Sequence, residues 1–160
     1  MSGRRAARPV ARARSSAHGG VRVTLANCQR DARVPVAWLR RVTDRAVRQL
    51  RIRGPGVMAI SLIDRHAMTR LNRRLLGHHG LTDVLSFRYD GEAIIGEVLV
   101  SPAFARRYAE EHGLVFREEL ARYVVHGLLH WLGHDDHTTA EQRRMRRMED
   151  AVLRPCTADP

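Results

Sequence analysis

The amino-acid sequence predicts a single α+β domain, in which a mixed β-sheet of about four strands is backed by helices. Three observations support this fold class. Segments rich in β-branched and aliphatic residues alternate with segments whose apolar residues recur at helical spacing. The dipeptide Asp90-Gly91, a strong hairpin signal, separates the last two strand-like segments. The chain has 160 residues, 44% of them hydrophobic, which is enough for one hydrophobic core.

The chain begins with a segment that has no acidic side chain and almost no large apolar one. We expect residues 1–20 to form a disordered basic tail and residues 21–155 to form the folded domain. An arginine-rich start is also typical of organelle transit peptides, but no convincing amphipathic face supports that alternative. The arginines of this segment are Arg4, Arg5, Arg8, Arg12 and Arg14.

The first half of the domain is expected to alternate strands with helices. Apolar and polar residues alternate over residues 21–28, which predicts a strand. Pro35 suits the first turn of a helix, whose apolar residues share one face up to residue 50. A largely buried strand follows at residues 57–63, and an aspartate then caps a helix over residues 64–76.

The second half is expected to form a hairpin and then three helices. The hairpin strands lie at residues 82–87 and 93–101. Helices are predicted at residues 102–112, at residues 116–132, and from Thr138 or Thr139 to about residue 153. The element order is β-α-β-α-β-β-α-α-α, which indicates a sheet backed by helices.

The chain is strongly basic, with a formal net charge of +11 and a pI near 11.4. All of its basic residues other than histidine are arginines. Genome composition can explain the preference for arginine over lysine, but it does not explain the net charge. An electropositive surface attracts polyanions, so nucleic acid and acidic membranes are the candidate partners.

The other compositional features concern membrane insertion, cofactor binding and cellular location. No apolar run approaches the roughly 20 residues that span a bilayer, so we expect no membrane segment. We also expect no dinucleotide cofactor. Cys28 and Cys156 match no metal-ligand spacing and are too few for a disulfide framework, which favours a reducing, cytoplasmic location.

The most informative stretch is residues 126–137, which contains a cluster of candidate metal ligands. His126 and His130 are four residues apart, so on a helix they project from one face and can share one metal ion. Gly133 suits the end of that helix, and further histidine and aspartate side chains follow it at once. Two imidazoles with a carboxylate or a third imidazole suit one zinc ion, in a three-ligand site that leaves a position open for water or substrate.

Two residues compete for the third ligand position. Asp136 is favoured by its spacing, whereas His137 is favoured by its chemical type. His134 follows the turn immediately and is expected to point elsewhere. Neighbouring residues in an extended loop point in opposite directions, so one ion is not expected to bind both Asp136 and His137. We favour Asp136 and keep His137 as the alternative.

The residue after the first histidine argues against a metalloprotease of the HExxH type. Such an enzyme has a glutamate there, which acts as the general base for the metal-bound water. The chain has Gly127 at this position. The general base therefore comes from elsewhere, or the metal alone lowers the pKa of the water sufficiently.

Several motifs together resemble those of the YbeY family of metal-dependent endoribonucleases, which are rRNA maturation factors. Residues 126–137, HGLLHWLG followed by HDDH, are similar to the family's metal motif. Leu71-Asn72 precedes TDVLSF at residues 82–87 with similar spacing. Residues 96–101 resemble the family's GDIxIS strand, with Glu97 in place of aspartate, and the Met-Glu-Asp at residues 148–150 is like its closing helix.

The resemblance implies that residues 21–155 form a metal-dependent endoribonuclease domain. Its implied activity is single-strand-specific RNA cleavage in rRNA maturation and ribosome quality control, and its implied partners are ribosomal RNA and the small ribosomal subunit. The alternatives are a ribosome-associated RNA-binding factor with a mainly structural zinc and, less favoured, a metalloprotease.

The sequence departs from the family pattern in two places. The family's YRxKD-like stretch, whose arginine is thought to matter for RNA cleavage, is replaced by Leu-Leu-Gly-His-His at residues 75–79, so Arg73 or Arg74 is a candidate substitute. The family's third ligand, the histidine of GYDH, is displaced here by one extra residue, which leaves the choice of third ligand open. Thr82 and Asp83 are further candidates for substrate binding, although both can simply fix the junction between loop and strand.

Overall fold

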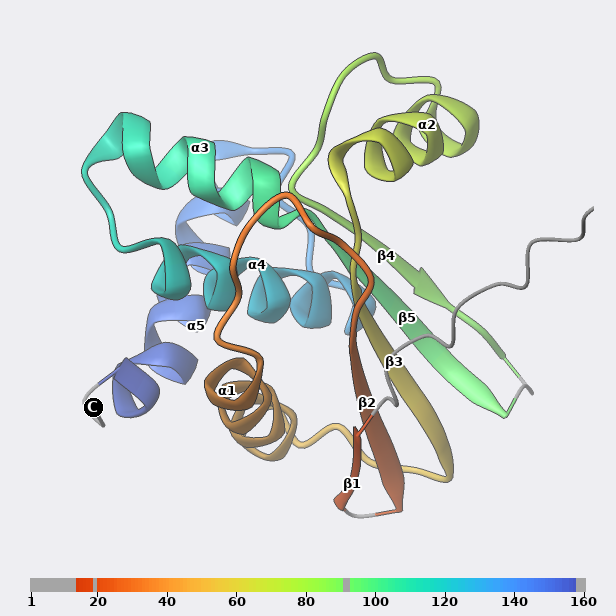
Figure 1. The fold of residues 1–160 in the computed structure, drawn as a ribbon. Helices are drawn as coiled ribbons and strands as arrows, with labels where there is room; N and C mark the ends of the chain where they lie inside the picture. The colour runs from red at the N-terminus through yellow and green to blue at the C-terminus, as the bar shows by residue number, and fades with distance from the viewer. Residues whose placement is uncertain (1–13, 19, 91–92, 158–160) are drawn as a thin grey trace, which may run out of the picture.

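The computed structural model describes residues 14–18, 20–90 and 93–157, which form one mixed sheet and five helices (Figure 1). The five strands lie in the order β1-β2-β3-β5-β4. The central strands β2, β3 and β5 are parallel to one another, and β1 and β4 are antiparallel edge strands. The strands are β1 Arg14–His18, β2 Val21–Asn27, β3 Gly56–Leu62, β4 Val84–Arg88 and β5 Ile94–Val100.

The helices connect the strands in the predicted order. Helix α1 (Val36–Gln49) joins β2 to β3, and α2 (Arg65–Leu76) joins β3 to β4. Asp64 caps α2 as predicted, because its side chain accepts a hydrogen bond from the backbone N–H of Ala67 at 2.8 Å. The last three helices are α3 Pro102–His112, α4 Phe116–Trp131 and α5 Thr139–Thr157.

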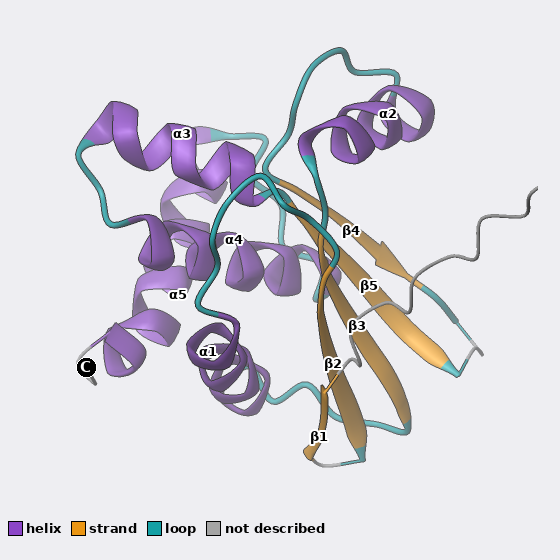
Figure 2. Ribbon diagram, viewed as in Figure 1, coloured by secondary structure: helices purple, strands orange, loops and turns teal. Residues whose placement is uncertain are grey.

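The helices cover the two faces of the sheet unequally (Figure 2). Successive residues of a strand point to opposite faces, so Val98 joins the main core while Leu99 joins a smaller cluster with Met68 of α2. Helices α1, α3, α4 and α5 pack on the main-core side. Helix α4 is central, since it contacts β4, β5 and the other three helices of that side.

A glycine allows α4 to lie close to the sheet. Gly127 faces β4 and β5, and a Cβ at this position would collide with the side chains of Val98 and Val84. The hydroxyl of Ser86 on β4 donates a hydrogen bond to the carbonyl of Gly127 at 2.9 Å. The close approach fixes the depth of α4, and with it the position of His126 and His130, which lie on either side of this glycine in the helix.

The predicted fold class is confirmed, with a correction at the N-terminal end. Residues 14–18 were expected in a disordered tail, but they form β1, which pairs with β2. Edge pairing uses backbone groups, so the polar sequence of this strand carried no alternating pattern to detect. Residues 1–13 and 19 of the predicted tail lie outside the described residues, as do residues 91–92 of the predicted hairpin turn.

Helix α5 is also longer than expected, because it continues to Thr157 rather than ending near residue 153. Within the described part of the chain, no helix combines the length and the apolar character needed to cross a bilayer.

Candidate metal centre

Three side chains with metal-binding atoms converge beside the C-terminal half of α4. His126 and His130 lie one turn apart on α4, and their Nε2 atoms are 2.9 Å apart. Asp136, from the loop before α5, places Oδ2 3.5 Å from Nε2 of His126 and Oδ1 3.7 Å from Nε2 of His130. The ligand atoms of these three partly buried residues lie within 4.8 Å of one another.

The end of α4 explains how Asp136 reaches the two histidines. Gly133 has a φ of 92°, in the left-handed region that glycine adopts without a steric penalty. The backbone N–H of His134 then donates to the carbonyl of Leu129 at 3.1 Å, which closes the turn. Gln142 of α5 donates from Nε2 to the carbonyl of Asp136 at 3.0 Å, so the returning loop is held at both ends.

The other ring nitrogens of the two histidines have acceptors that define the tautomers. Nδ1 of His126 lies 2.7 Å from a carboxylate oxygen of Glu149, and Nδ1 of His130 lies 2.8 Å from the carbonyl of His134. Both Nδ1 atoms therefore donate a proton, which leaves a lone pair on each Nε2. Two lone pairs that face each other at 2.9 Å repel, so this donor set requires a cation or a proton between them.

The geometry fits a tetrahedral zinc ion. With bonds of about 2.1 Å, two ligands of tetrahedral zinc lie about 3.4 Å apart. The three separations of 2.9, 3.5 and 3.7 Å fall around that value. Within the described residues, no other group of three histidine, cysteine or acidic side chains has this spacing.

The alternative third ligand, His137, lies away from the cluster. Its side chain is 82% exposed, and its Nε2 lies 4.0 Å from a carboxylate oxygen of Asp135. Asp136 and His137 therefore point in different directions, as the extended loop predicts. The side chain of Asp136 is 36% exposed and faces the two histidines.

The buried carboxylate of Glu149 on α5 is a member of the site whose role the sequence did not reveal. Glu149 is 4% exposed and also accepts a hydrogen bond from Nη1 of Arg122 at 3.0 Å. Arg122 is held in turn by Asp150 at 2.8 Å. One clue was available, because Glu149 shares the buried face of α5 with Met145 and Val152.

This network perturbs the first histidine. Burial lowers the pKa of His126, but the hydrogen bond that His126 donates to Glu149 and the charges of Glu149, Asp83 and Asp136 outweigh it, so the pKa is raised overall. A carboxylate partner also fixes the ring orientation and makes Nε2 a stronger ligand.

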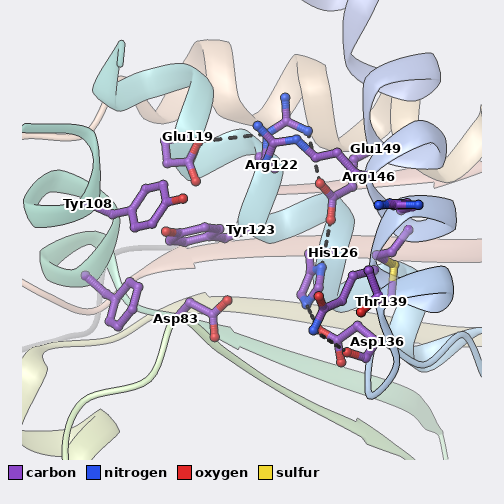
Figure 3. A pocket seen from close by; sticks show the side chains of 14 residues that line it. Asp83, Tyr108, Glu119, Arg122, Tyr123, His126, Asp136, Thr139, Arg146 and Glu149 are labelled. Carbon is purple, nitrogen blue, oxygen red and sulfur yellow. Dashed lines mark hydrogen bonds and ion pairs between the residues drawn. The ribbon is translucent and has the colours of Figure 1, made fainter. Parts of the chain in front are cut away.

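Two members of the cluster, His126 and Asp136, line an open cleft of about 520 Å³ between α3, α4, α5 and the start of β4 (Figure 3). Tyr108, Tyr123 and Asp83 form one side of the cleft, and His126 and Asp136 lie on the other. The remaining lining residues are Phe104, Glu119, Arg122, Thr139, Gln142, Arg143, Met145, Arg146 and Glu149.

Two buried side chains that line the cleft, Glu119 and Tyr123, have altered pKa values. Burial raises the pKa of Glu119, although the nearby positive charge of Arg122 and a hydrogen bond from Tyr123 oppose the shift. Burial also raises the pKa of Tyr123, with the negative charges of Glu119 and Asp83 adding to the effect. Neither residue was singled out from the sequence.

The predicted substrate-binding residues have separate locations. Asp83 lines the cleft, and one of its oxygens accepts hydrogen bonds from the backbone N–H of Val84 at 2.8 Å and the hydroxyl of Thr82 at 3.1 Å. Thr82 therefore fixes the start of β4 through Asp83. Arg73 and Arg74 are exposed on α2 and do not line the cleft.

An α+β domain with three candidate metal ligands beside an open cleft has the arrangement expected of a metal-dependent hydrolase. The model of the family described as Endoribonuclease YbeY matches residues 25–157, well over half of the chain. The chain therefore belongs to the YbeY endoribonuclease family, which confirms the resemblance of its motifs.

Individual relatives agree with this assignment. An Endoribonuclease YbeY from Thermodesulfovibrio yellowstonii is 31% identical over 126 residues, which cover 74% of this chain and 79% of that protein. One from Sulfurihydrogenibium is 32% identical over 128 residues, covering 76% of this chain and 84% of that protein. The one from Myxococcus xanthus is 39% identical over 103 residues, and this chain covers only 35% of its length.

A solution structure from Thermotoga maritima has the same fold. Its TM-score is 0.58 at 22% sequence identity, and the match covers 88% of this chain and 93% of the other. At that identity the likeness concerns the fold alone.

Proposed function

We propose that the chain is a metal-dependent endoribonuclease that cuts single-stranded RNA. The observation that carries the proposal is the convergence of three ligand atoms at the edge of an open cleft that His126 and Asp136 line, with two imidazole lone pairs directed at one point. The relatives are named as endoribonucleases, and this name supplies the reaction class. The net charge of +11 supports a polyanionic substrate.

In this proposal His126, His130 and Asp136 hold one zinc ion. A zinc ion in such a site acidifies a bound water and neutralises charge on a phosphate oxygen. Glu149 and the carbonyl of His134 keep both imidazoles in the tautomer that presents Nε2 to the ion. Asp83 presents a carboxylate to the cleft from the opposite side, where it can contact the RNA beside the scissile phosphate.

The biological role that we propose is the maturation of ribosomal RNA and ribosome quality control in the cytoplasm, with the small ribosomal subunit as the partner. The resemblance of the motifs to those of rRNA maturation factors supports this role. The arrangement of the site also favours an enzyme over an RNA-binding factor with a structural zinc. A structural zinc site is closed by four protein ligands, and the candidate group among the described residues has three.

A position-specific comparison tests the proposal. Wild type, His126→Ala, His137→Ala and a chelated wild-type sample would be incubated with a labelled single-stranded RNA and with the same sequence in a duplex. We expect wild type and His137→Ala to cut the single strand, and His126→Ala and the chelated sample to lose that activity. Cleavage that survives both the substitution and the chelator would remove the metal from the chemistry, and binding without any cleavage would favour the RNA-binding factor.

A further inference from the structure

A second concave surface lies beside the candidate metal centre, between α2 and α3. We call it the α2–α3 groove; its volume is about 430 Å³ and both helices lie at the same end of the sheet (Figure 1). Three of its lining residues are arginines, and none of its described lining residues is acidic. The lining residues are Arg65, His66, Thr69, Arg70, Leu81 and Arg107.

The charge of the metal cleft makes this groove significant. Asp83, Glu119, Asp136 and Glu149 line the cleft, so its four carboxylates outnumber its three arginines. One of those arginines, Arg122, is already paired with carboxylates. Without the metal ion the cleft therefore has little net attraction for a polyanion, and the charge that holds RNA must lie outside it.

The cleft and the groove meet at one pair of side chains. Phe104 lines the cleft, and the guanidinium carbon of Arg107 lies 5.0 Å from the centre of its ring. Arg107 itself lines the groove, where it forms a half-exposed ion pair with Glu111 at 3.8 Å. An RNA strand that leaves the cleft over Phe104 therefore passes directly to Arg107 and on to α2.

On α2 the arginines continue in the same direction. Arg65 and Arg70 are both exposed and both line the groove, and Arg73 is exposed about one turn after Arg70. The hydroxyl of Thr69 adds a hydrogen-bond donor suited to a phosphate oxygen. The arrangement offers charges and donors for a sugar-phosphate backbone and no wall of aromatic rings for bases.

We propose that the α2–α3 groove binds the phosphate backbone of the single-stranded RNA that extends beyond the scissile site. This inference rests on the proposed function for its substrate, but it concerns binding rather than cleavage. Arg73, which was predicted to bind substrate, lines neither the metal cleft nor the groove, but it is exposed on the same helix as Arg70. The groove supplies affinity and direction, and the metal centre supplies the reaction.

A salt titration tests the groove. The Arg65→Ala/Arg70→Ala variant would be compared with wild type and with Arg41→Ala/Arg53→Ala, a control with the same charge change on exposed residues of α1 and of the loop before β3. Binding of a fluorescent 12-nucleotide single-stranded RNA would be followed by anisotropy, with chelator present so that the RNA stays intact. Circular dichroism would verify that all three proteins are folded.

We expect the groove variant to reduce the slope of log K against log salt by about 1.4, since each phosphate contact on a single strand contributes about 0.7. That change corresponds to about a 25-fold loss of affinity at 0.1 M salt. In cleavage assays we expect the groove variant to have a higher KM than wild type and the same kcat. A groove variant that binds like wild type, or no more weakly than the control, would overturn the proposal. A protein that binds RNA through the groove but never cuts it would refute the proposed function alone.

Discussion

Replacing Glu149 by glutamine tests how the metal centre is supported. Glu149 is buried and holds Nδ1 of His126 at 2.7 Å, so the substitution removes a negative charge from a hydrogen bond while keeping an acceptor of the same shape. Loss of such a carboxylate partner weakens metal binding by about 10- to 100-fold, or about 1.4 to 2.8 kcal/mol. Arg122 is not left unpaired, because Asp150 remains at 2.8 Å.

The assay is a competition titration of zinc against a chromophoric chelator. The matched control is Asp150→Asn, which removes a charge from the same arginine but does not contact His126. We expect Glu149→Gln to bind zinc at least tenfold more weakly than both wild type and Asp150→Asn. Equal affinity in all three proteins would refute the role of Glu149 as the partner that orients the imidazole.

Three further predictions follow from the packing and electrostatics of the site. Gly127→Ala is expected to lower the free energy of unfolding by about 1 to 3 kcal/mol, because the new methyl group collides with Val98 and Val84. Urea denaturation measures this change, and unchanged stability would contradict the close approach of α4 to the sheet. The raised pKa of Glu119 contributes stability that is fully present below its ordinary value of 4.5 and is lost as the pH rises through the raised value. As the pH rises from 4.5 through the raised pKa, wild type should therefore lose free energy of unfolding relative to Glu119→Gln. If the free energies of unfolding of the two proteins change in parallel with pH, the raised pKa of Glu119 is contradicted. The raised pKa of His126 makes protons compete with the metal, so the zinc affinity should fall as the pH is lowered through that pKa. Zinc affinity would be measured from about pH 8 to about pH 5, and an affinity that does not change with pH would argue against His126 as a ligand.

The part of the site that lies on one helix was predictable from the sequence. His126 and His130 face the same way through helical geometry alone, and no tertiary contact is needed to see it. The direction of Asp136 depended on the turn after Gly133, and spacing along the chain was enough to favour it over His137. The strands and helices of the domain were predictable for the same reason, since each carries its own apolar pattern.

The parts that depend on long-range contacts were not predictable in this way. Glu149 supports His126 from a helix 23 residues further along, and only the packing of α5 on α4 brings the two together. Strand β1 has no apolar alternation, because it is held by backbone pairing with β2. The cleft collects residues from four elements, so Glu119 and Tyr123 could not be connected with the site from their own neighbours in sequence.

The central claim is that His126, His130 and Asp136 together hold one metal ion. Its most direct test is the zinc content, by native mass spectrometry, of wild type, Asp136→Ala and His137→Ala. The proposed site predicts one zinc per chain in wild type and in His137→Ala, and its loss in Asp136→Ala. Full retention of zinc in Asp136→Ala, together with loss in His137→Ala, would contradict it.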